Sequence, residues 1–243
     1  SELRGIEVTS SDVTLGAAVT QHEMIHSDEL FEACPIIRET AALIADPQVR
    51  YRGTLGGNVG NGDPANDMPA LMQCLDATFV VESVSGVRNI KAREFYQSAY
   101  FTALEAGEII THVKFKRPTD GHGYAYKKLK RKVGDYATAA AAVILEMSKG
   151  KVKAASITLT NLADVPLYAQ EAVQLIVGTS LEASDIAAAA RAATAITNPT
   201  ADGRGSVEYK KGMAGVMVTR ALEAAKDRAG ETKSGGPLGW LKR

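Results

Sequence analysis

The segment from Tyr51 to Pro69 constrains the fold more than any other part of the chain, because it holds five glycines between two apolar runs. Glycine permits left-handed backbone angles and lets a ligand approach the bare backbone. Successive amide N–H groups in such a loop form an anion-binding concavity. A helix expected to begin at Asn66–Asp67 would add unpaired N–H groups and a positive dipole end, with Asp67 as its cap. The segment predicts a site for a phosphate-bearing ligand, although a plain turn is the more ordinary reason for such a loop.

Two common phosphate-binding fingerprints do not fit this segment. A Walker loop needs Lys followed by Ser or Thr after its last glycine, and the Rossmann fingerprint needs a different glycine spacing. The text Thr54-Leu55-Gly56-Gly57-Asn58, followed by Gly62-Asp63-Pro64 and Asp67-Met68-Pro69, instead resembles the second FAD motif of the medium subunit of molybdenum hydroxylases. That family includes xanthine dehydrogenase and the aerobic carbon monoxide dehydrogenases.

The resemblance extends over roughly residues 1 to 230 and lies nearest the carbon monoxide dehydrogenase branch. Three further stretches carry it: Pro35–Thr40, Leu129–Ala141 and Met213–Met217. It implies an α+β fold with two domains. Residues 1–119 would form the second lobe of a PCMH-type FAD-binding domain. Residues 120–230 would form an antiparallel sheet packed with helices, like the C-terminal domain of carbon monoxide dehydrogenase flavoproteins.

The resemblance also assigns candidate cofactor residues. A pyrophosphate would be cradled through the backbone amides of Thr54, Leu55, Gly56, Gly57 and Asn58, with the Thr54 and Asn58 side chains adding bonds. Asp67 would cap its helix and touch the flavin or ribityl portion, and Asp63 is a candidate for the same neighbourhood. Tyr136 would lie against the isoalloxazine face, although Asp135-Tyr136 is equally compatible with a core tyrosine at the start of a strand.

The function implied is that of a cofactor carrier. No nucleophile–base arrangement and no Cys/His spacing typical of zinc or iron–sulfur sites appears in the sequence, so we name no catalytic or metal-ligating residue. The resemblance implies that FAD takes electrons from an iron–sulfur small subunit and passes them to an external acceptor such as quinone. The molybdenum cofactor would sit on a large subunit, in a dimer of heterotrimers. The alternative is a structural or assembly module that has lost FAD binding.

The medium subunits of this family also carry an earlier Ala-Gly-Gly-His-Ser-type motif that supplies the other half of the pyrophosphate cradle. No such text occurs in these 243 residues. Losing three or four charge-assisted hydrogen bonds would weaken binding by about 4 kcal/mol after a discount for non-additivity, roughly a thousandfold. We therefore expect the chain alone to hold FAD weakly or not at all.

Composition excludes some other functions. With 28 basic and 28 acidic residues the net charge is zero, so no broad attraction to nucleic acid is expected. No apolar run approaches the ~20 residues of a membrane span, and the first residues do not resemble a signal peptide. We expect a cytoplasmic protein, either free or at the inner face of the cell membrane. We also expect free, buried thiols at Cys34 and Cys74.

Apolar periodicity predicts the order of the elements. Strands are expected within 5–19, at 78–83, 87–91 and 109–116, across 123–132, and over 137–147 with a partner strand from Val152. Helices are expected from Thr20 toward Cys34, from Pro35 to about Asp46, over 70–75, from Pro166 to Gly178, from a cap at Ser184 to about Thr197, and over Val207–Ala229. Residues 95–102 predict an aromatic loop or short helix, and 231–243 a flexible tail that includes Trp240.

Two patterns leave alternatives open. His22 and His26 have helical spacing and could ligate a metal, but without a third ligand a solvated helix face is the simpler interpretation. The basic strand over 123–132 could contact nucleic acid, an acidic partner or the phosphates of a flavin; the neutral remainder of the chain disfavours nucleic acid.

Overall fold

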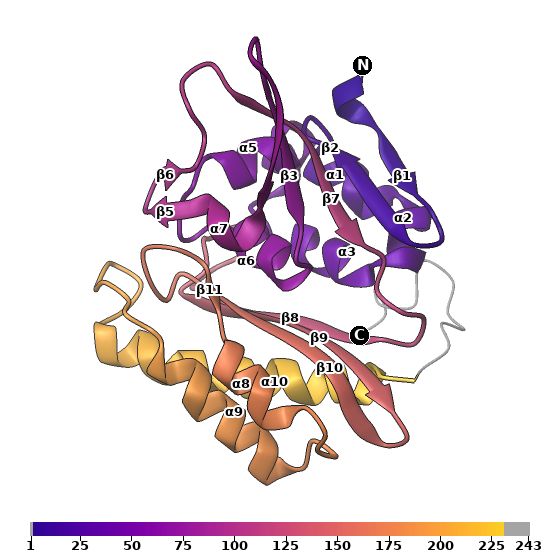
Figure 1. Ribbon diagram of the computed structural model, residues 1–243. Helices are drawn as coiled ribbons and strands as arrows, with labels where there is room; N and C mark the ends of the chain where they lie inside the picture. Colours follow the sequence, from indigo (N-terminus) through magenta and orange to yellow (C-terminus); the bar gives the residue numbers. More distant parts are fainter. Residues whose placement is uncertain (1, 231–243) are drawn as a thin grey trace.

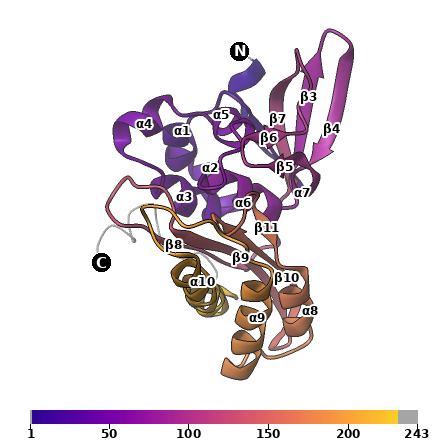
Figure 2. The ribbon, with the colours of Figure 1, turned by 90° about the vertical axis from the view of Figure 1, so that its left-hand side faces the viewer.

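The computed structural model describes residues 2–230, so the predicted tail at 231–243, with Trp240, lies outside the described residues. The chain forms alternating layers (Figures 1 and 2). A five-stranded sheet borders a group of short helices, those helices cover one face of a four-stranded sheet, and three C-terminal helices cover its other face.

The first sheet is antiparallel and has the order β1-β2-β7-β3-β4. Its strands are β1 (Ile6–Val8), β2 (Asp12–Gly16), β7 (Ile109–Lys116), β3 (Thr78–Ser83) and β4 (Gly86–Lys91). Alternate side chains such as Leu15, Phe79 and Val113 are fully buried, as expected when one face of a sheet packs on a core. The strands predicted within 5–19, at 78–83 and 87–91, and at 109–116 are confirmed, and β3 and β4 pair as a hairpin.

The first group of helices is more finely divided than the sequence predicts. It comprises α1 (Gln21–His26), α2 (Asp28–Ala33), α3 (Pro35–Ala42), α4 (Pro47–Arg52), α5 (Leu55–Gly60) and α6 (Asp67–Cys74), after a short 3-10 turn, η1 (Glu2–Arg4). The capping box of Thr20 with Glu23 is confirmed. The prediction of one helix from Thr20 to Cys34 is wrong, because Ser27 ends α1 and its hydroxyl caps α2 by accepting from the Leu30 N–H.

Two further predictions in this region need correction. The helix from Pro35 ends at Ala42 rather than near Asp46, and the chain then turns through Ala45 at a φ of +43°. Asp46 caps a helix that the sequence analysis did not predict, α4, by accepting from the Val49 N–H. Within the predicted aromatic loop, α7 (Ala92–Phe95) leads into a two-stranded sheet of β5 (Tyr96–Ser98) and β6 (Phe101–Thr102).

The second sheet has the order β11-β10-β9-β8 and is covered on both faces. Its strands are β8 (Gly123–Leu129), β9 (Ala139–Ser148), β10 (Lys151–Thr160) and β11 (Leu167–Tyr168). The alanine run in β9 forms a strand, as predicted. Ala140 and Ala142 join the core shared with the first lobe, whereas Ala139 and Ala141 join the core against the C-terminal helices. The small side chains let helices approach both faces of the sheet.

The C-terminal helices are α8 (Gln170–Ile176), α9 (Ala183–Ala195) and α10 (Val207–Arg228). The predicted helix start at Pro166 is wrong, since Leu167–Tyr168 first pairs with β10. The predicted cap at Ser184 is also wrong, because Glu182 caps α9 in a reciprocal box with Asp185. Ser206 caps α10 by accepting from the Tyr209 N–H.

The two lobes are tied by polar contacts at the junction. Glu39 on α3 accepts from the Tyr126 N–H at 2.9 Å and from the Arg228 guanidinium at 2.6 Å. The domain boundary at 119–120 stays a prediction. The core of the first lobe includes Ala140 and Ala142, which lie beyond that boundary in the sequence.

Other predictions concern the thiols, the histidines and membrane crossing. Cys34 and Cys74 are free and buried, as predicted. The His22 ring stacks on Tyr51 and lies 4.0 Å from the His26 ring, and among residues 2–230 no group of three His, Cys, Asp or Glu side chains could hold a metal ion. None of the helices described is both long enough and apolar enough to span a membrane.

Candidate functional site

The glycine-rich motif folds as a helix rather than as an open loop. Thr54 caps α5, its hydroxyl oxygen accepting from the Gly57 N–H at 3.0 Å. The Leu55 N–H donates to the Val19 carbonyl and the Gly56 N–H to the Ala17 carbonyl, each at 2.8 Å. The expectation that these amides point outward to cradle an anion is therefore wrong, since each already has a partner inside the fold.

The paired glycines have different local roles. A Cβ on Gly56 would lie 2.6 Å from the Ala17 Cβ, so this glycine is required for close packing of α5 on the turn that follows β2. A Cβ on Gly57 would meet only the Thr54 hydroxyl, at 3.0 Å, and Gly57 is exposed. Gly57 is thus the exposed glycine of the pair, and apart from the Thr54 hydroxyl the space beside it is open.

Asn58, not Asp67, supplies the side chain at the start of α6. Its Oδ1 accepts from the Met68 N–H at 3.3 Å, and its carbonyl accepts from the Asn66 side-chain amide at 3.0 Å. The predicted helix begins at Asp67, but the predicted capping role of Asp67 is wrong, since no side-chain cap is formed by Asn66 and the Asp67 carboxylate turns elsewhere.

The Asp67 carboxylate joins the two lobes in a buried cluster. It accepts from the Tyr126 hydroxyl at 2.6 Å and from the Lys128 ammonium at 2.7 Å, and the Asp67 and Lys128 side chains are 5% and 1% exposed. Burial raises the pKa of Asp67 above its usual 3.8, against the opposing effect of Lys128. Lys128 also donates to the Leu43 carbonyl at 3.2 Å. Asp67 therefore fixes α6 on β8.

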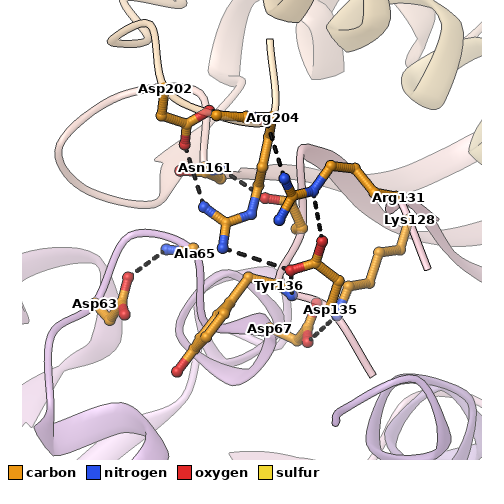
Figure 3. Close-up of polar contacts among 12 residues, drawn as sticks. Asp63, Ala65, Asp67, Lys128, Arg131, Asp135, Tyr136, Asn161, Asp202 and Arg204 are labelled. Atoms are coloured by element: carbon orange, nitrogen blue, oxygen red, sulfur yellow. Dashed lines mark hydrogen bonds and ion pairs between the residues drawn. The ribbon is translucent and has the colours of Figure 1, made fainter. Parts of the chain in front are cut away.

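Tyr136 is a partly exposed residue, not the core tyrosine that was the alternative prediction for it. Its side chain is 47% exposed, so it is not a core tyrosine. It lines a cavity of about 470 Å³ together with Asp63, Tyr100, Asn161 and Arg204. Figure 3 shows Asp63, Tyr136 and Arg204, which line this cavity, and the contact of Asp67 with Lys128. The structure thus brings Asp63 and Tyr136 to one cavity, which residues 54–58 do not line.

Four residues of this region were missed by the sequence analysis. Tyr100 is 62% exposed on the β5–β6 turn at a φ of +62°, and the Asp63 carboxylate raises the pKa of its phenol. Asn161 has a φ of +59° and donates to the Ala137 carbonyl at 2.6 Å. Arg204 and Asp202 come from the polar loop before α10. No local sequence pattern identifies these residues, because they come from separate parts of the chain that meet at the cavity only in the folded protein.

The side chains present fit a phosphate-bearing cofactor, although the backbone amides do not. The Thr54 hydroxyl, which accepts from the Gly57 N–H, keeps its own proton to donate, and the Asn58 side chain, whose Oδ1 accepts from the Met68 N–H, keeps its amide N–H groups; a diphosphate is bound by donors of this kind. Lys130 is a cation beside the Asp67–Lys128 pair; burial and the Lys128 ammonium lower its pKa. The half-exposed ring of Tyr136 offers an aromatic surface to a planar ring.

The fold and the matched families define a class: an α+β chain with an FAD-binding domain. The family described as FAD binding domain in molybdopterin dehydrogenase matches residues 1–117, and CO dehydrogenase flavoprotein C-terminal domain matches residues 124–225. The chain belongs to this family of FAD-binding medium subunits of molybdenum hydroxylases, which are components of oxidoreductases. In this family the molybdenum and iron–sulfur centres belong to other subunits.

Known members are similar over nearly the whole chain. The carbon monoxide dehydrogenase medium chain of Afipia carboxidovorans is 57% identical over 228 residues, covering 94% of this chain and 79% of that one. The medium chain of Hydrogenophaga pseudoflava is 42% identical, covering 92% and 78%. A solved carbon monoxide dehydrogenase from Oligotropha carboxidovorans superposes with a TM-score of 0.93 at 57% identity, covering 94% of this chain and 80% of that one.

Proposed function

We propose that this chain is the flavoprotein subunit of an aerobic carbon monoxide dehydrogenase. In this proposal FAD accepts electrons from the iron–sulfur clusters of a small subunit and delivers them to an external acceptor such as quinone. A molybdopterin large subunit completes the complex, which we propose to be a dimer of heterotrimers. A quinone acceptor would place the complex at the cytoplasmic face of the membrane.

The residues of this chain bind and orient the cofactor in the proposal. The Thr54 hydroxyl and the Asn58 amide would donate to the pyrophosphate, and Gly57 would leave room for it. Leu55 and Gly56 would shape the site by holding α5 against the first sheet, since their amides donate to the Val19 and Ala17 carbonyls.

The remaining candidates would act around the ring system. Asp67 would hold α6 in place through its contacts with Tyr126 and Lys128. Tyr136 would cover one face of the isoalloxazine and exclude water from it, and Asp63 would line the same cavity.

One observation carries the proposal: the Thr54–Asp67 motif stands intact in a chain that is 57% identical to a carbon monoxide dehydrogenase medium chain. The test is anaerobic addition of carbon monoxide to the natively purified complex. We expect the visible flavin absorption to bleach and to return when a quinone analogue is added. A flavin that stays oxidised under carbon monoxide but bleaches with another reductant would refute the substrate assignment.

The second candidate, a structural or assembly module without cofactor, is favoured by a specific observation. The Leu55 and Gly56 amides are used for packing, so this part of the motif has a structural role of its own. A natively purified complex that contains the chain in full amount but shows no flavin absorption would select this alternative.

A further inference from the structure

We propose that Arg204 and Asp135 form a positioning pair that fixes the ring of Tyr136 at the flavin. This inference rests on the proposed function, because it concerns how the loop before α10 controls one residue of that site. Neither residue is a catalytic residue in this account; both act through Tyr136.

Asp135 is the centre of the arrangement. Its side chain is only 7% exposed and accepts three hydrogen bonds. The Arg131 Nε donates at 2.8 Å, the Tyr136 N–H at 2.9 Å and the Arg204 guanidinium at 3.5 Å. The arginine contacts and the Tyr136 N–H hold the pKa of Asp135 below its usual value, so the carboxylate stays charged and keeps its partners at neutral pH. Because one of those bonds comes from the Tyr136 N–H, Asp135 helps to fix the backbone position from which the Tyr136 side chain extends.

Arg204 adds a contact to the ring itself. Its guanidinium carbon lies 5.5 Å from the centroid of the Tyr136 ring, within the range of a cation–π interaction. The same guanidinium contacts Asp135 and Asp202, as Figure 3 shows. Among residues 2–230 no hydrogen bond to the Tyr136 phenol is found. The ring is therefore restrained by its backbone bond to Asp135 and by the Arg204 cation.

The position of Arg204 is set by a buried anchor at the start of the last helix. Lys210, whose side chain is 2% exposed, contacts the Asp202 carboxylate at 3.1 Å and donates to the Thr200 carbonyl at 2.9 Å. Asp202 in turn accepts from the Arg204 N–H at 2.8 Å. The Arg131 guanidinium also donates to the Gly203 carbonyl at 3.0 Å. The loop that carries Arg204 is thus held from both sides.

This geometry requires an arginine at position 204, because a positive charge alone would not make the same contacts. A guanidinium presents donors in a planar fork that can contact two carboxylates while stacking on a ring, which an ammonium group does not reproduce. Losing the restraint would let the half-exposed Tyr136 ring turn away and admit water to the cofactor. The equilibrium constant for flavin reduction should then change about threefold, the size expected for a cation–π contact at a half-exposed site.

The test is a double-mutant cycle in the natively purified complex, read out by flavin reduction potential. Arg204→Gln and Tyr136→Ala should each shift the potential, and Arg204→Gln should add nothing in the Tyr136→Ala background. Arg204→Lys should behave like Arg204→Gln, whereas a matched control, Arg191→Gln at an exposed position of α9, should have no effect. If the Arg204 variants fail to assemble, Asp135→Asn replaces them in the cycle: it should shift the flavin reduction potential of the wild type and add nothing in the Tyr136→Ala background.

The possible results separate this inference from the proposed function. If Tyr136→Ala shifts the potential and Arg204→Gln does not, or if the two shifts add, the positioning role is refuted and the flavin site stands. If flavin is bound but Tyr136→Ala has no effect, Tyr136 is not at the flavin and the inference fails with that assignment. A complex without flavin refutes the proposed function itself.

Discussion

Replacing Asp67 tests whether the two lobes are joined by a buried charge pair. Asp67→Asn removes the anion beside the Lys128 ammonium, whose side chain is 1% exposed and then keeps the Leu43 carbonyl as its hydrogen-bond acceptor. Removing one partner of a buried pair costs about 3–5 kcal/mol, because the remaining charge stays desolvated. At about 2–4 °C per kcal/mol for a chain of this size, the melting temperature should fall by roughly 6–20 °C.

Lys128→Met should show a pH dependence that Asp67→Asn lacks. Burial already raises the pKa of Asp67, and loss of the ammonium raises it further. Because the folded-state pKa then exceeds the unfolded one, protonation stabilises the folded variant. The contribution of Asp67 to the unfolding free energy, measured as the difference between Lys128→Met and Asp67→Asn/Lys128→Met, should therefore be most stabilising below the usual Asp pKa and should decline as the pH rises through the raised value.

The assay is denaturant unfolding of the full chain followed by circular dichroism, with the double variant Asp67→Asn/Lys128→Met closing the cycle. The double variant should recover most of the stability, since no unpaired charge remains. Lys116→Met, which breaks the exposed Lys116–Asp12 contact, is the control and should leave stability unchanged within error. A loss below about 1 kcal/mol for Asp67→Asn would refute the reasoning that this pair is desolvated.

Three further predictions follow from local geometry. Gly56→Ala should destabilise the chain measurably in thermal melts, because the new Cβ would lie 2.6 Å from the Ala17 Cβ; an unchanged melting temperature would contradict this. Glu108→Gln should reduce the acid sensitivity of folding: the Arg88 guanidinium lowers the pKa of Glu108 to about 2, so its stabilisation is present above the usual value of 4.5 and is lost as the pH falls toward 2. Acid titrations of both chains that coincide would refute it. The Cys74 thiol should resist alkylation at pH 8 until the chain is unfolded, since burial raises its pKa to about 11; rapid labelling of the native chain would be the contrary result.

The sequence predicted those parts of the fold that depend on local periodicity. Alternating apolar residues identified the hairpin at 78–91 and the strand at 109–116, and the Thr20 capping box identified the start of α1. The alanine run of β9 was predicted as a strand from its context, against its helical propensity. The break at Ser27 was missed, because a serine within an apolar helical pattern can be either a surface residue or a cap.

The local geometry of the candidate site differs from the prediction, and its cofactor residues stay a prediction. Glycine density indicated an open loop, yet Thr54 caps a helix there, and the amides of Leu55 and Gly56 donate to carbonyls in the turn that follows β2. Those carbonyls belong to a tertiary contact, which no local pattern reveals. Asp67 was predicted to cap α6, but its carboxylate instead pairs at the junction of the lobes with Lys128, which lies 61 positions away in the sequence. Long-range contacts therefore decided each of these outcomes.

The central claim is that the Thr54–Asp67 motif holds a flavin at the open face of Gly57, and flavin stoichiometry tests it most directly. The natively purified complex of the wild-type chain should contain FAD. Gly57→Val should lose most of it, whereas Gly212→Val, which places the same side chain on an exposed helical glycine of α10 with no neighbour within 4 Å of its Cβ, should retain it. Equal FAD content in the Gly57→Val and wild-type complexes would contradict the account.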